Sequence, residues 1–376
     1  MKTQVTNQHL DAAGVQPPTT LQTPSTRSCF EENKGIRSMI LSVVAAALLS
    51  VLPYARAQQA GENGIPTNLP GVTSAPAPPS GFSPLAASDS ELATDGFPPR
   101  PDRKVSPGAY AAWAKAMQAA KERVFPVLEL TNHFNGPHVA AGPILNNTGY
   151  SYNWSAVVDT TTAHNYGSTS FTSVEGFWVI PIAQQAFGAC TGGWDYESSW
   201  VGIDGYASKD VLQAGTESDA YCNGGTKSTY YSAWYEWYPL GEVRISSLPV
   251  SAGDTMVIWV GSNSSTSGTA FVENMNTDQY VSINFSAPAG TQLVGNSAEW
   301  VVERPGVNGG LATLTNYISD VFVNGYANTA AGTEYGPGSN GAITLTMLDN
   351  NGNPISEPLS IIGFGGVWFI DEGSAY

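Results

Sequence analysis

Two carboxylates within one apolar segment are the first candidates for chemistry in this sequence. The segment 298–303, AEWVVE, alternates as a β-strand does, which puts Glu299 and Glu303 on one face and Ala298 and Trp300 on the other. A half-exposed strand with one wet face would account for this pattern. The alternative is a carboxylate held inside a cleft, where it can move protons in a reaction.

Three further stretches place polar side chains in apolar surroundings: 198–206 (SSWVGIDGY), 210–218 (DVLQAGTES) and 231–239 (YSAWYEWYP). The side chains that alternation groups on shared faces are Trp200 with Asp204, Gln213 with Gly215, and Trp234 with Glu236 and Tyr238. A buried amide must find hydrogen-bond partners, because otherwise it destabilises the fold. The aromatic side chains would either line a cleft or fill a core.

Several familiar kinds of active site are absent from the sequence. It contains no HExxH zinc motif, no GxSxG nucleophile elbow, no P-loop and no Asp-Thr-Gly or Asp-Ser-Gly signature. The four histidines lack metal-ligand spacing: His9, His133, His138 and His164. If the protein is an enzyme, we therefore expect it to work without a metal or cofactor, through carboxylates, amides and aromatic rings.

The charge of the chain changes sharply near residue 125. From there to the C-terminus it has four Lys and Arg residues and 22 Asp and Glu residues, a formal charge of −18. Such a body repels nucleic acid and anionic membranes, so we expect neither as a partner. Acid pH would protonate many carboxylates and relieve their repulsion, which predicts a domain suited to acidic surroundings. Nothing in the sequence requires more than a monomer.

The first 57 residues predict a secreted, extracellular protein. The apolar run 39–52, MILSVVAAALLSVL, follows Lys34 and Arg37 and precedes an A-x-A sequence that ends at Ala57. This pattern is typical of a signal peptide, and the run is too short for a membrane span. We therefore assign residues 1–57 to an N-terminal extension and signal peptide, cleaved after Ala57.

Residues 58–134 are predicted to form a Pro-rich, partly helical linker or propeptide. Within it, 107–124 has the composition of a helix, with Pro107 in the first turn and Ser106 as the cap. The stretch 100–123 carries six basic residues against two acidic ones. The helix is either part of a solvated linker, or part of a zymogen's propeptide that docks electrostatically on the acidic domain.

Residues 135–376 are predicted to form one all-β domain. Segments rich in Val, Ile, Thr and aromatic residues are punctuated by Gly, Asn, Asp and Pro. The candidate strands are 177–182, 200–204, 228–240, 255–261, 269–275, 279–285, 298–303, 342–348 and 366–371. Many short strands with turn signals between them indicate a sandwich or a barrel.

Two cysteines, Cys190 and Cys222, would remain after cleavage, because Cys29 lies upstream of Ala57. An even pair in an oxidising compartment indicates one disulfide, and two unpaired thiols are the alternative. In the chain-entropy account, such a bridge stabilises the fold by about 3–4 kcal/mol.

The four motif stretches resemble, closely and in order, those of the glutamic peptidase (eqolisin) family. W-x-G-I-D-G is found at 200–205, L-Q-x-G at 212–215 and Y-x-A-W-Y-E-W-Y-P at 231–239, and AEWVVE at 298–303 is similar to A-E-W-I-V-E. The likeness is good over 150–305 and weaker towards the C-terminus. It implies an antiparallel two-sheet β-sandwich of the concanavalin A-like, lectin-like jelly-roll kind. It also implies a metal-free acid endopeptidase that hydrolyses peptide bonds in proteins.

By the same resemblance, the catalytic pair maps onto Gln213 and Glu299. Ionised Glu299 would act as the general base on the attacking water, and the Gln213 amide would donate to the oxyanion. Protonated Glu299 would then give its proton to the leaving nitrogen. The residues expected to support these groups or bind substrate are Trp200, Asp204, Trp234, Glu236 and Tyr238.

Two other functions remain open at this point. A non-catalytic carbohydrate-binding sandwich would stack aromatic side chains on sugar rings and would not need Gln213. A glycoside hydrolase would use Glu236 and Glu299 as paired carboxylates. A peptidase needs both Gln213 and Glu299, so substitutions at these three positions distinguish the hypotheses.

Overall fold

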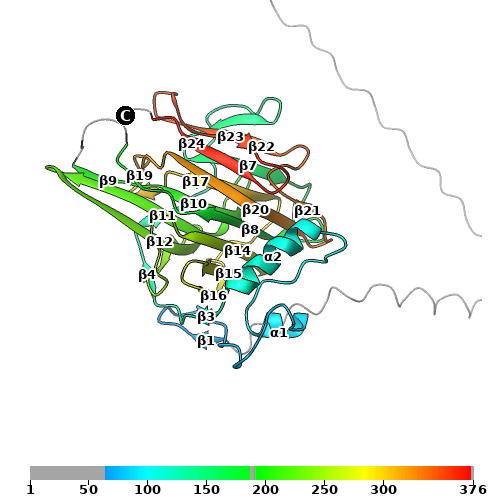
Figure 1. Ribbon diagram of the computed structural model, residues 1–376. Coiled ribbons are helices and arrows are strands. Elements are labelled where there is room, and N and C mark those ends of the chain that lie inside the picture. Colours follow the sequence, from blue (N-terminus) through cyan, green and yellow to red (C-terminus); the bar gives the residue numbers. More distant parts are fainter. Residues whose placement is uncertain (1–63, 187–189, 191, 374–376) are drawn as a thin grey trace, which may run out of the picture. The chain divides into compact units, whose positions relative to one another are not determined.

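The candidate strands pair into two large, mainly antiparallel sheets that pack face to face (Figure 1). The computed structural model describes residues 64–186, 190 and 192–373. Every strand predicted from the sequence overlaps an observed strand, so the predicted all-β sandwich is confirmed. The predicted signal peptide, residues 1–57, lies outside the described residues.

The first sheet carries all four motif stretches, and we call it the site sheet. In order across the sheet, its strands are β4 (Leu128–Leu130), β13 (Val243–Ile245), β12 (Thr226–Trp237), β11 (Leu212–Asn223), β10 (Ser198–Ile203), β17 (Ser297–Glu303), β7 (Trp154–Thr160), β22 (Ile343–Leu348), β23 (Pro354–Ile361) and β24 (Val367–Asp371). Two short strands extend it: β9 (Gly193–Asp195) beside β11, and β6 (Thr148–Ser151) parallel to β22.

We call the second sheet the back sheet. Its strands, in order, are β20 (Ser319–Thr329), β8 (Phe171–Val179), β14 (Thr255–Ser264), β15 (Ser267–Asn274), β16 (Gln279–Ser286), β2 (Thr73–Ser74) and β1 (Ile65–Pro66). The short strand β21 (Glu334–Tyr335) pairs with β20, and β3 (Glu122–Arg123) runs parallel to β16. A separate small sheet contains β5 (His133–Phe134), β18 (Gly306–Val307) and β19 (Gly310–Leu311).

Strand β20 belongs to both large sheets. Residues 319–322 pair with β24 of the site sheet, and the part of the strand from Val323 onward pairs with β8 of the back sheet. The register of the second part is interrupted between Val323 and Tyr326. One continuous strand therefore joins the two layers.

Large apolar side chains from both sheets fill the space between them. Two indole N–H groups also cross this space: Trp300 Nε1 donates to the backbone carbonyl of Glu175, and Trp178 Nε1 donates to the Thr216 hydroxyl, each at 2.9 Å. Because Trp300 faces inward, alternation along β17 leaves Glu299 on the outer face of the site sheet.

The segment whose composition predicted a linker is folded onto the outer face of the back sheet. It contains α1 (Asp89–Thr94) and α2 (Pro107–Ala119). Trp113 of α2 is buried in one cluster with Phe177 and Phe271, which point away from the sandwich core. The few large side chains of this N-terminal segment are therefore enough to cover an apolar face of the back sheet. Within the described residues, no helix has the length and hydropathy needed to cross a bilayer.

Helix α2 ends at Ala119 rather than at residue 124, because strand pairing replaces the helix. The backbone N–H groups of Lys121 and Glu122 donate to the carbonyl of Asp278, at 3.0 and 2.9 Å, and β3 then lies beside β16. Lys121 Nζ also lies 2.8 Å from Asp278 Oδ2, with both side chains largely exposed. This contact surface is mainly apolar.

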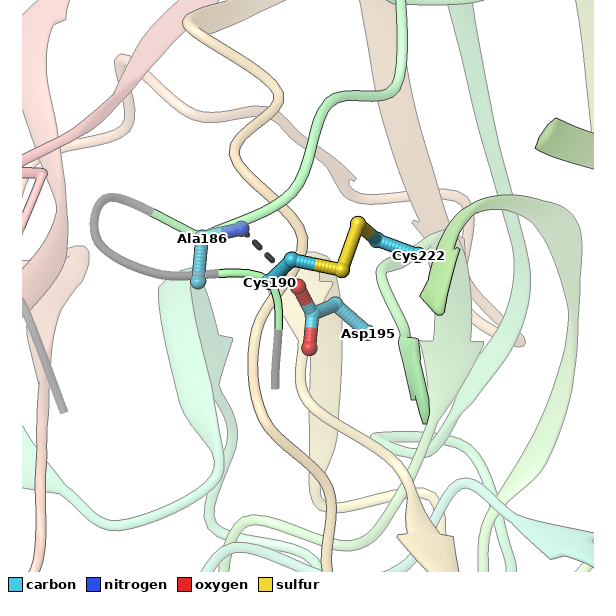
Figure 2. Close-up of a disulfide and its surroundings, with 4 residues drawn as sticks. All are labelled: Ala186, Cys190, Asp195 and Cys222. Atoms are coloured by element: carbon cyan, nitrogen blue, oxygen red, sulfur yellow. Dashed lines mark hydrogen bonds between the residues drawn. A yellow bond between two sulfur atoms is a disulfide. The ribbon is translucent and has the colours of Figure 1, made fainter. Parts of the chain in front are cut away.

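The predicted disulfide between Cys190 and Cys222 is present (Figure 2). It joins residues 32 positions apart, with Cα atoms 5.5 Å from each other, and ties the chain before β9 to the far end of β11. Beside it, the backbone N–H of Ala186 donates to Asp195 Oδ2 at 2.9 Å.

Candidate active site

One row of paired residues across the site sheet brings the predicted catalytic residues together. Gly202 on β10 pairs with Gln213 on β11 and with Glu299 on β17. Glu236 on β12 continues the row beyond Gln213. Directly paired residues point to the same face, so the three polar side chains project from the outer face of the sheet. The Cα atoms of Gln213 and Glu299 lie two strand spacings apart, about 10 Å.

Two glycines make room for an indole ring beside this row. A Cβ atom on Gly202 would lie 2.7 Å from Cζ3 of Trp200, and one on Gly215 would lie 2.5 Å from the Cβ of Trp200. The Trp200 indole N–H donates to Glu303 Oε2 at 2.9 Å. The predicted cleft residue Trp200 is thus a fixed part of the site floor, and its position depends on both glycines.

Gln213 is fully buried and already binds a peptide carbonyl. Its Nε2 donates to the backbone oxygen of Asn135. Its own amide oxygen has no hydrogen-bond partner among the described residues. An amide N–H that points at a peptide carbonyl is the arrangement needed to stabilise an oxyanion on that carbonyl.

Glu299 is also fully buried, and neither carboxyl oxygen has a hydrogen-bond partner within the part of the chain that the structure describes. Burial raises the pKa of Glu299 well above its ordinary value. The nearby Ser297 side chain and Tyr206 backbone lower this pKa, and the charges of Asp204 and Asp159 raise it. An unpaired charge in such a place is costly, which favours the neutral form of this carboxyl group while the site is covered.

Asp204 fixes the loop that leads into the strand of Glu299. Its carboxylate accepts hydrogen bonds from the backbone N–H groups of Val294, Gly295 and Asn296, at 2.7, 2.9 and 2.8 Å. Its backbone has a φ of 71°, in the left-handed region that non-glycine residues seldom adopt. Asp204 is therefore placed to position Glu299 through the backbone of β17.

Glu303 and Trp154 complete the floor of the site. They pair across β17 and β7, and the Trp154 ring lies edge-on to Trp200, with ring centroids 5.1 Å apart. Besides the Trp200 indole, Glu303 accepts the amide of Asn153 at 3.0 Å and the backbone N–H of Gly136 at 3.2 Å. The carboxylate of Glu303 thus has partners on both oxygens, unlike that of Glu299.

The two remaining predicted cleft residues flank the row. Trp234 pairs with Gly215 and is fully buried, and its indole N–H has no partner among the residues described. Tyr238 follows β12 and is half-buried. A Cβ atom built on Gly136 would lie 3.4 Å from the Tyr238 ring, so this ring packs against the segment that covers the site.

That covering segment, residues 131–139, is called the strap below. Its central backbone groups, at Asn135 and Gly136, all bond to side chains of the site sheet. Asn135 N–H donates to Glu236 Oε2 at 2.9 Å, Asn135 C=O accepts from Gln213, Gly136 N–H donates to Glu303 Oε1, and Gly136 C=O accepts from Trp154 Nε1 at 3.0 Å. The site therefore holds these two residues of the strap through all four of their backbone polar groups.

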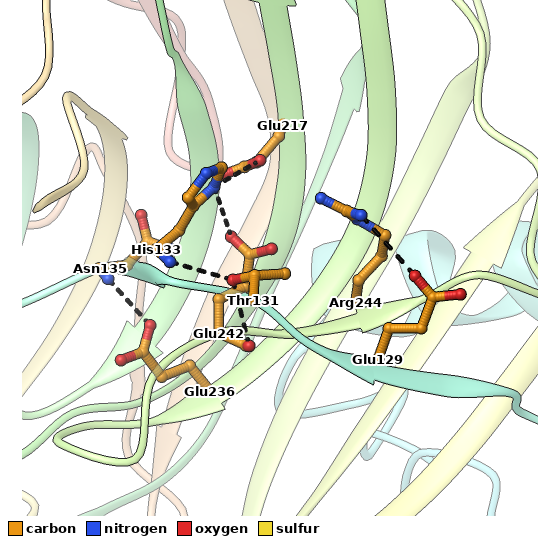
Figure 3. A network of polar contacts seen from close by, with 8 residues as sticks. All are labelled: Glu129, Thr131, His133, Asn135, Glu217, Glu236, Glu242 and Arg244. Atoms are coloured by element: carbon orange, nitrogen blue, oxygen red, sulfur yellow. Dashed lines mark hydrogen bonds and ion pairs between the residues drawn. The ribbon is translucent and has the colours of Figure 1, made fainter. Parts of the chain in front are cut away.

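A buried polar cluster anchors one end of the strap (Figure 3). His133 Nδ1 lies 2.8 Å from Glu217 Oε1 and 3.8 Å from Glu242 Oε2. Burial raises the pKa of both glutamates, and it lowers the pKa of His133, an effect to which Arg244 adds. These side chains are possible metal ligands, but 2.8 Å is a hydrogen-bond distance, and the nearby Arg244 cation opposes a second positive charge.

Sequence reasoning missed Trp154, Asn153 and the strap, and it assigned Glu303 no role in the site. Alternation from Trp154 onward could have placed its ring on an outer sheet face. Its pairing with Glu303 depends on which strands are neighbours, and the sequence does not contain that information. The strap has no motif of its own.

A sequence profile of the Peptidase A4 family matches residues 152–358, more than half of the chain. The chain belongs to the Peptidase A4 family. The family predicted from the four motifs is therefore confirmed, as is the predicted enzyme class, a glutamic-type peptide hydrolase. The strap and everything before it lie upstream of the range that matches the Peptidase A4 family.

Named members of the Peptidase A4 family are similar to this chain. Aspergillopepsin-2 of Aspergillus niger is 31% identical over 219 residues, which cover 58% of this chain and 72% of the relative. Scytalidopepsin B of Scytalidium lignicola is 38% identical over 107 residues, 28% of this chain and 38% of the relative. Among solved structures, scytalido-glutamic peptidase with a transition state analog inhibitor matches with a TM-score of 0.47 and 25% identity, over 58% of this chain and 98% of that one.

Proposed function

We propose that this protein is an acid-acting endopeptidase in which Gln213 and Glu299 carry out the chemistry. The observation that supports this most directly is the row on the site sheet. At one position Gln213 donates to a peptide carbonyl, and two strands away the Glu299 carboxyl has no partner among the described residues. A site that binds backbone groups rather than particular side chains suits protein substrates.

The proposed reaction needs only these two side chains and a water molecule. Ionised Glu299 takes a proton from the water as its oxygen attacks the scissile carbonyl carbon. Gln213 donates to the carbonyl oxygen as negative charge develops there, and one such donor contributes about 3–4 kcal/mol. Glu299 then gives the proton to the leaving nitrogen as the C–N bond breaks. Because an amide does not titrate, this donor works at any pH.

The pH dependence follows from the burial of Glu299. Only its ionised form accepts a proton, whereas burial raises its pKa. A hydrogen bond from the attacking water favours the ionised form and lowers the pKa. We expect the ascending arm of the pH profile of kcat/KM to report this titration in the free enzyme.

Neither alternative function is favoured by a specific observation. The Cα atoms of Glu236 and Glu299 are three strand spacings apart, about 14 Å, and Gln213 and Gly202 lie between them in the row. With the strap in place, the indole rings of Trp154, Trp200 and Trp234 are fully buried and offer no exposed face for stacking on a sugar.

We also propose that the protein is secreted and acts as a monomer on protein or peptide substrates, without a metal or cofactor. The apolar run 39–52 with its A-x-A sequence supports secretion. Residues upstream of the family match are proposed to act as a propeptide. The packing of 64–130 on the back sheet and of the strap on the site sheet supports this role.

The test is digestion of a denatured protein at about pH 4, with pepstatin and a chelator present. Glu299→Gln and Gln213→Ala are each expected to lower the rate by about 100- to 1,000-fold while the protein stays folded. Gln184→Ala, which changes an exposed glutamine in the same way, is the matched control and should match the parent. Full activity in Gln213→Ala, or loss of activity with the chelator, would contradict the proposed function.

A further inference from the structure

Two parts of the chain upstream of the family match lie on the two sheets, and they are held differently. The strap bonds to the site sheet through backbone groups at its centre, and its large apolar side chains, Phe134 and Val139, are 40% and 45% exposed. Residues 64–123, the N-terminal segment, instead bury Leu92, Phe97 and Trp113 in one cluster with the back sheet. The N-terminal segment would therefore lose far more apolar contact than the strap if it left its sheet.

The outer face of the back sheet is apolar where the N-terminal segment lies on it. Phe177, Val257, Phe271 and Tyr280 come from four neighbouring strands, β8, β14, β15 and β16, and each is at most 2% exposed. The Arg123 guanidinium also lies over the Tyr280 ring, 4.6 Å from its centroid. Without the N-terminal segment these side chains would form one exposed apolar patch, which a soluble monomer rarely carries. The patch therefore needs a partner, and this segment fits it.

Polar contacts hold the N-terminal segment at both of its ends. Near its start, β2 pairs antiparallel with β16, and at its end, β3 pairs parallel with the same strand. The side-chain amide of Asn68 also exchanges two hydrogen bonds with the backbone of Leu128 in the site sheet, at 2.7 and 2.9 Å. None of these contacts depends on the covalent link between β3 and β4.

We propose that the N-terminal segment is an independent partner of the back sheet: it stays bound as a second chain when the link between β3 and β4 is cut, and it binds most tightly in acid. This inference does not depend on the chemistry proposed for Gln213 and Glu299. The propeptide role proposed above then belongs to the strap, which lies on the outer face of the other sheet. After a cut downstream of β3, the protein consists of two chains joined by an apolar interface.

The carboxyl group of Glu273 is buried beneath the N-terminal segment. Burial raises its pKa to about 9, and the charge of Asp278 adds to this effect. Two nearby cations bond elsewhere: Lys121 Nζ lies 2.8 Å from Asp278 Oδ2, and Arg123 donates to two backbone carbonyls of the N-terminal segment. The other titratable groups of this region are Asp95, Glu122 and Tyr280.

A second carboxyl group, that of Glu175 on β8, lies beneath the same segment. Glu175 is 8% exposed and points to the same side of β8 as Phe177, two positions along the strand. Burial raises its pKa to about 8, and the charge of Glu334 adds to this effect. Lys115 of α2 lies over the Phe177 ring, 5.8 Å from its centroid, and Tyr326 of β20 pairs with Glu175. Both glutamates are therefore neutral while the N-terminal segment is bound.

The two carboxyl groups set the direction of the pH dependence. When the N-terminal segment leaves, both become exposed, and their pKa values return towards the ordinary 4.5. Above that pH the separated form has lost both protons, whereas the bound form keeps them up to about pH 8 and about pH 9. Binding is therefore strongest below about pH 4.5, and it weakens as pH rises, by up to about tenfold per pH unit for each group.

The test cuts the link without using the candidate site. A thrombin sequence is inserted after Phe125, which is 46% exposed between β3 and β4, in a full chain that carries Glu299→Gln. After thrombin treatment near neutral pH, gel filtration and intact-protein mass spectrometry should find both pieces in one complex at about pH 4. The N-terminal piece should leave the complex as the pH is raised towards about 10. Separation of the pieces at about pH 4 would overturn the inference.

Matched variants test whether the two carboxyl groups cause the release. The double variant Glu175→Gln with Glu273→Gln should shift the pH of half-release upward by at least about one unit, because neither side chain can then lose a proton. Glu122→Gln with Glu129→Gln, the same changes at two exposed positions, should match the parent. Trp113→Ala should shift the pH of half-release downward, because it removes a ring from the interface.

The two parts of the inference fail separately. Release at the same pH in the double Gln variant and in the parent would overturn the acid dependence, as would a parent complex that stays intact at about pH 10. Loss of the N-terminal piece at every pH would overturn its assignment as a second chain. Because thrombin makes the cut and every protein carries Glu299→Gln, none of these outcomes bears on the proposed function.

Discussion

Glu273 should contribute to the pH dependence of this protein's stability, and its replacement by Gln should remove that contribution. On β15 it lies on the same face as Phe271, towards the N-terminal segment, and it is fully buried. Neither of its oxygens has a hydrogen-bond partner among the described residues. Burial raises the pKa of Glu273 to about 9, and the charge of Asp278 adds to this effect.

The sign and size of the effect follow from proton linkage. Above the ordinary pKa of 4.5, the unfolded chain loses the Glu273 proton while the folded chain keeps it. Stability is therefore fully present below that pH and falls as pH rises towards the folded pKa. By pH 7 this window is about 2.5 pH units wide, and at 1.36 kcal/mol per unit the loss is about 3 kcal/mol.

The assay is urea unfolding at about pH 4 and about pH 7, with every protein carrying Glu299→Gln to prevent proteolysis during the measurement. Glu273→Gln should leave the free energy of unfolding nearly unchanged at the lower pH and raise it by about 3 kcal/mol at the higher pH. Glu122→Gln, the same change at an exposed position, should behave as the parent at both. Equal stability differences between Glu273→Gln and parent at the two pH values would refute the reasoning.

Three further changes have expected outcomes. Replacing both Cys190 and Cys222 by Ser should lower the free energy of unfolding by about 3–4 kcal/mol, measured with urea; no change would show that the bridge does not constrain the unfolded chain. Trp113→Ala should lower the free energy of unfolding of the full chain by about 3–5 kcal/mol in the same assay, and a loss below 1 kcal/mol would mean that α2 packs only loosely. Asp204→Ala should lower kcat at least about tenfold with little change in KM, because three backbone N–H groups before β17 lose the carboxylate that accepts their hydrogen bonds. Unchanged kcat would show that the loop does not position Glu299.

Most of the β-fold could be predicted because its local signals agree. Segments such as 298–303 and 279–285 combine alternation with β-branched and aromatic residues, and Gly or Asn follows them. Strand β20 was missed because Asn324 and Gly325 interrupt its apolar pattern where it changes sheets. The sequence left open whether residues 64–130 form a solvated linker or a docked propeptide, because a Pro- and Ala-rich composition hides a few large side chains, such as Leu92 and Phe97, that cover the back sheet.

The candidate site was predictable where the motifs are, and not elsewhere. Gln213 and Glu299 were selected from their motifs, and they share a row only because β10 lies between their strands. That strand order is long-range information, which local patterns do not carry. The covering of the site by Asn135 follows from hydrogen bonds across 78 residues of sequence, so composition gave no sign of it.

The sharing of β20 between the two sheets has a mechanical consequence. To slide or peel one layer from the other, the chain must break the hydrogen bonds of β20 with β24 or those with β8. Opening motions that release one sheet alone must therefore also break one of these two ladders. Amide protons in the centres of β8 and β24 should exchange with solvent through one shared, cooperative event rather than sheet by sheet. A cleft on such a body admits substrate by moving a covering segment such as the strap, while the sheets beneath it stay rigid.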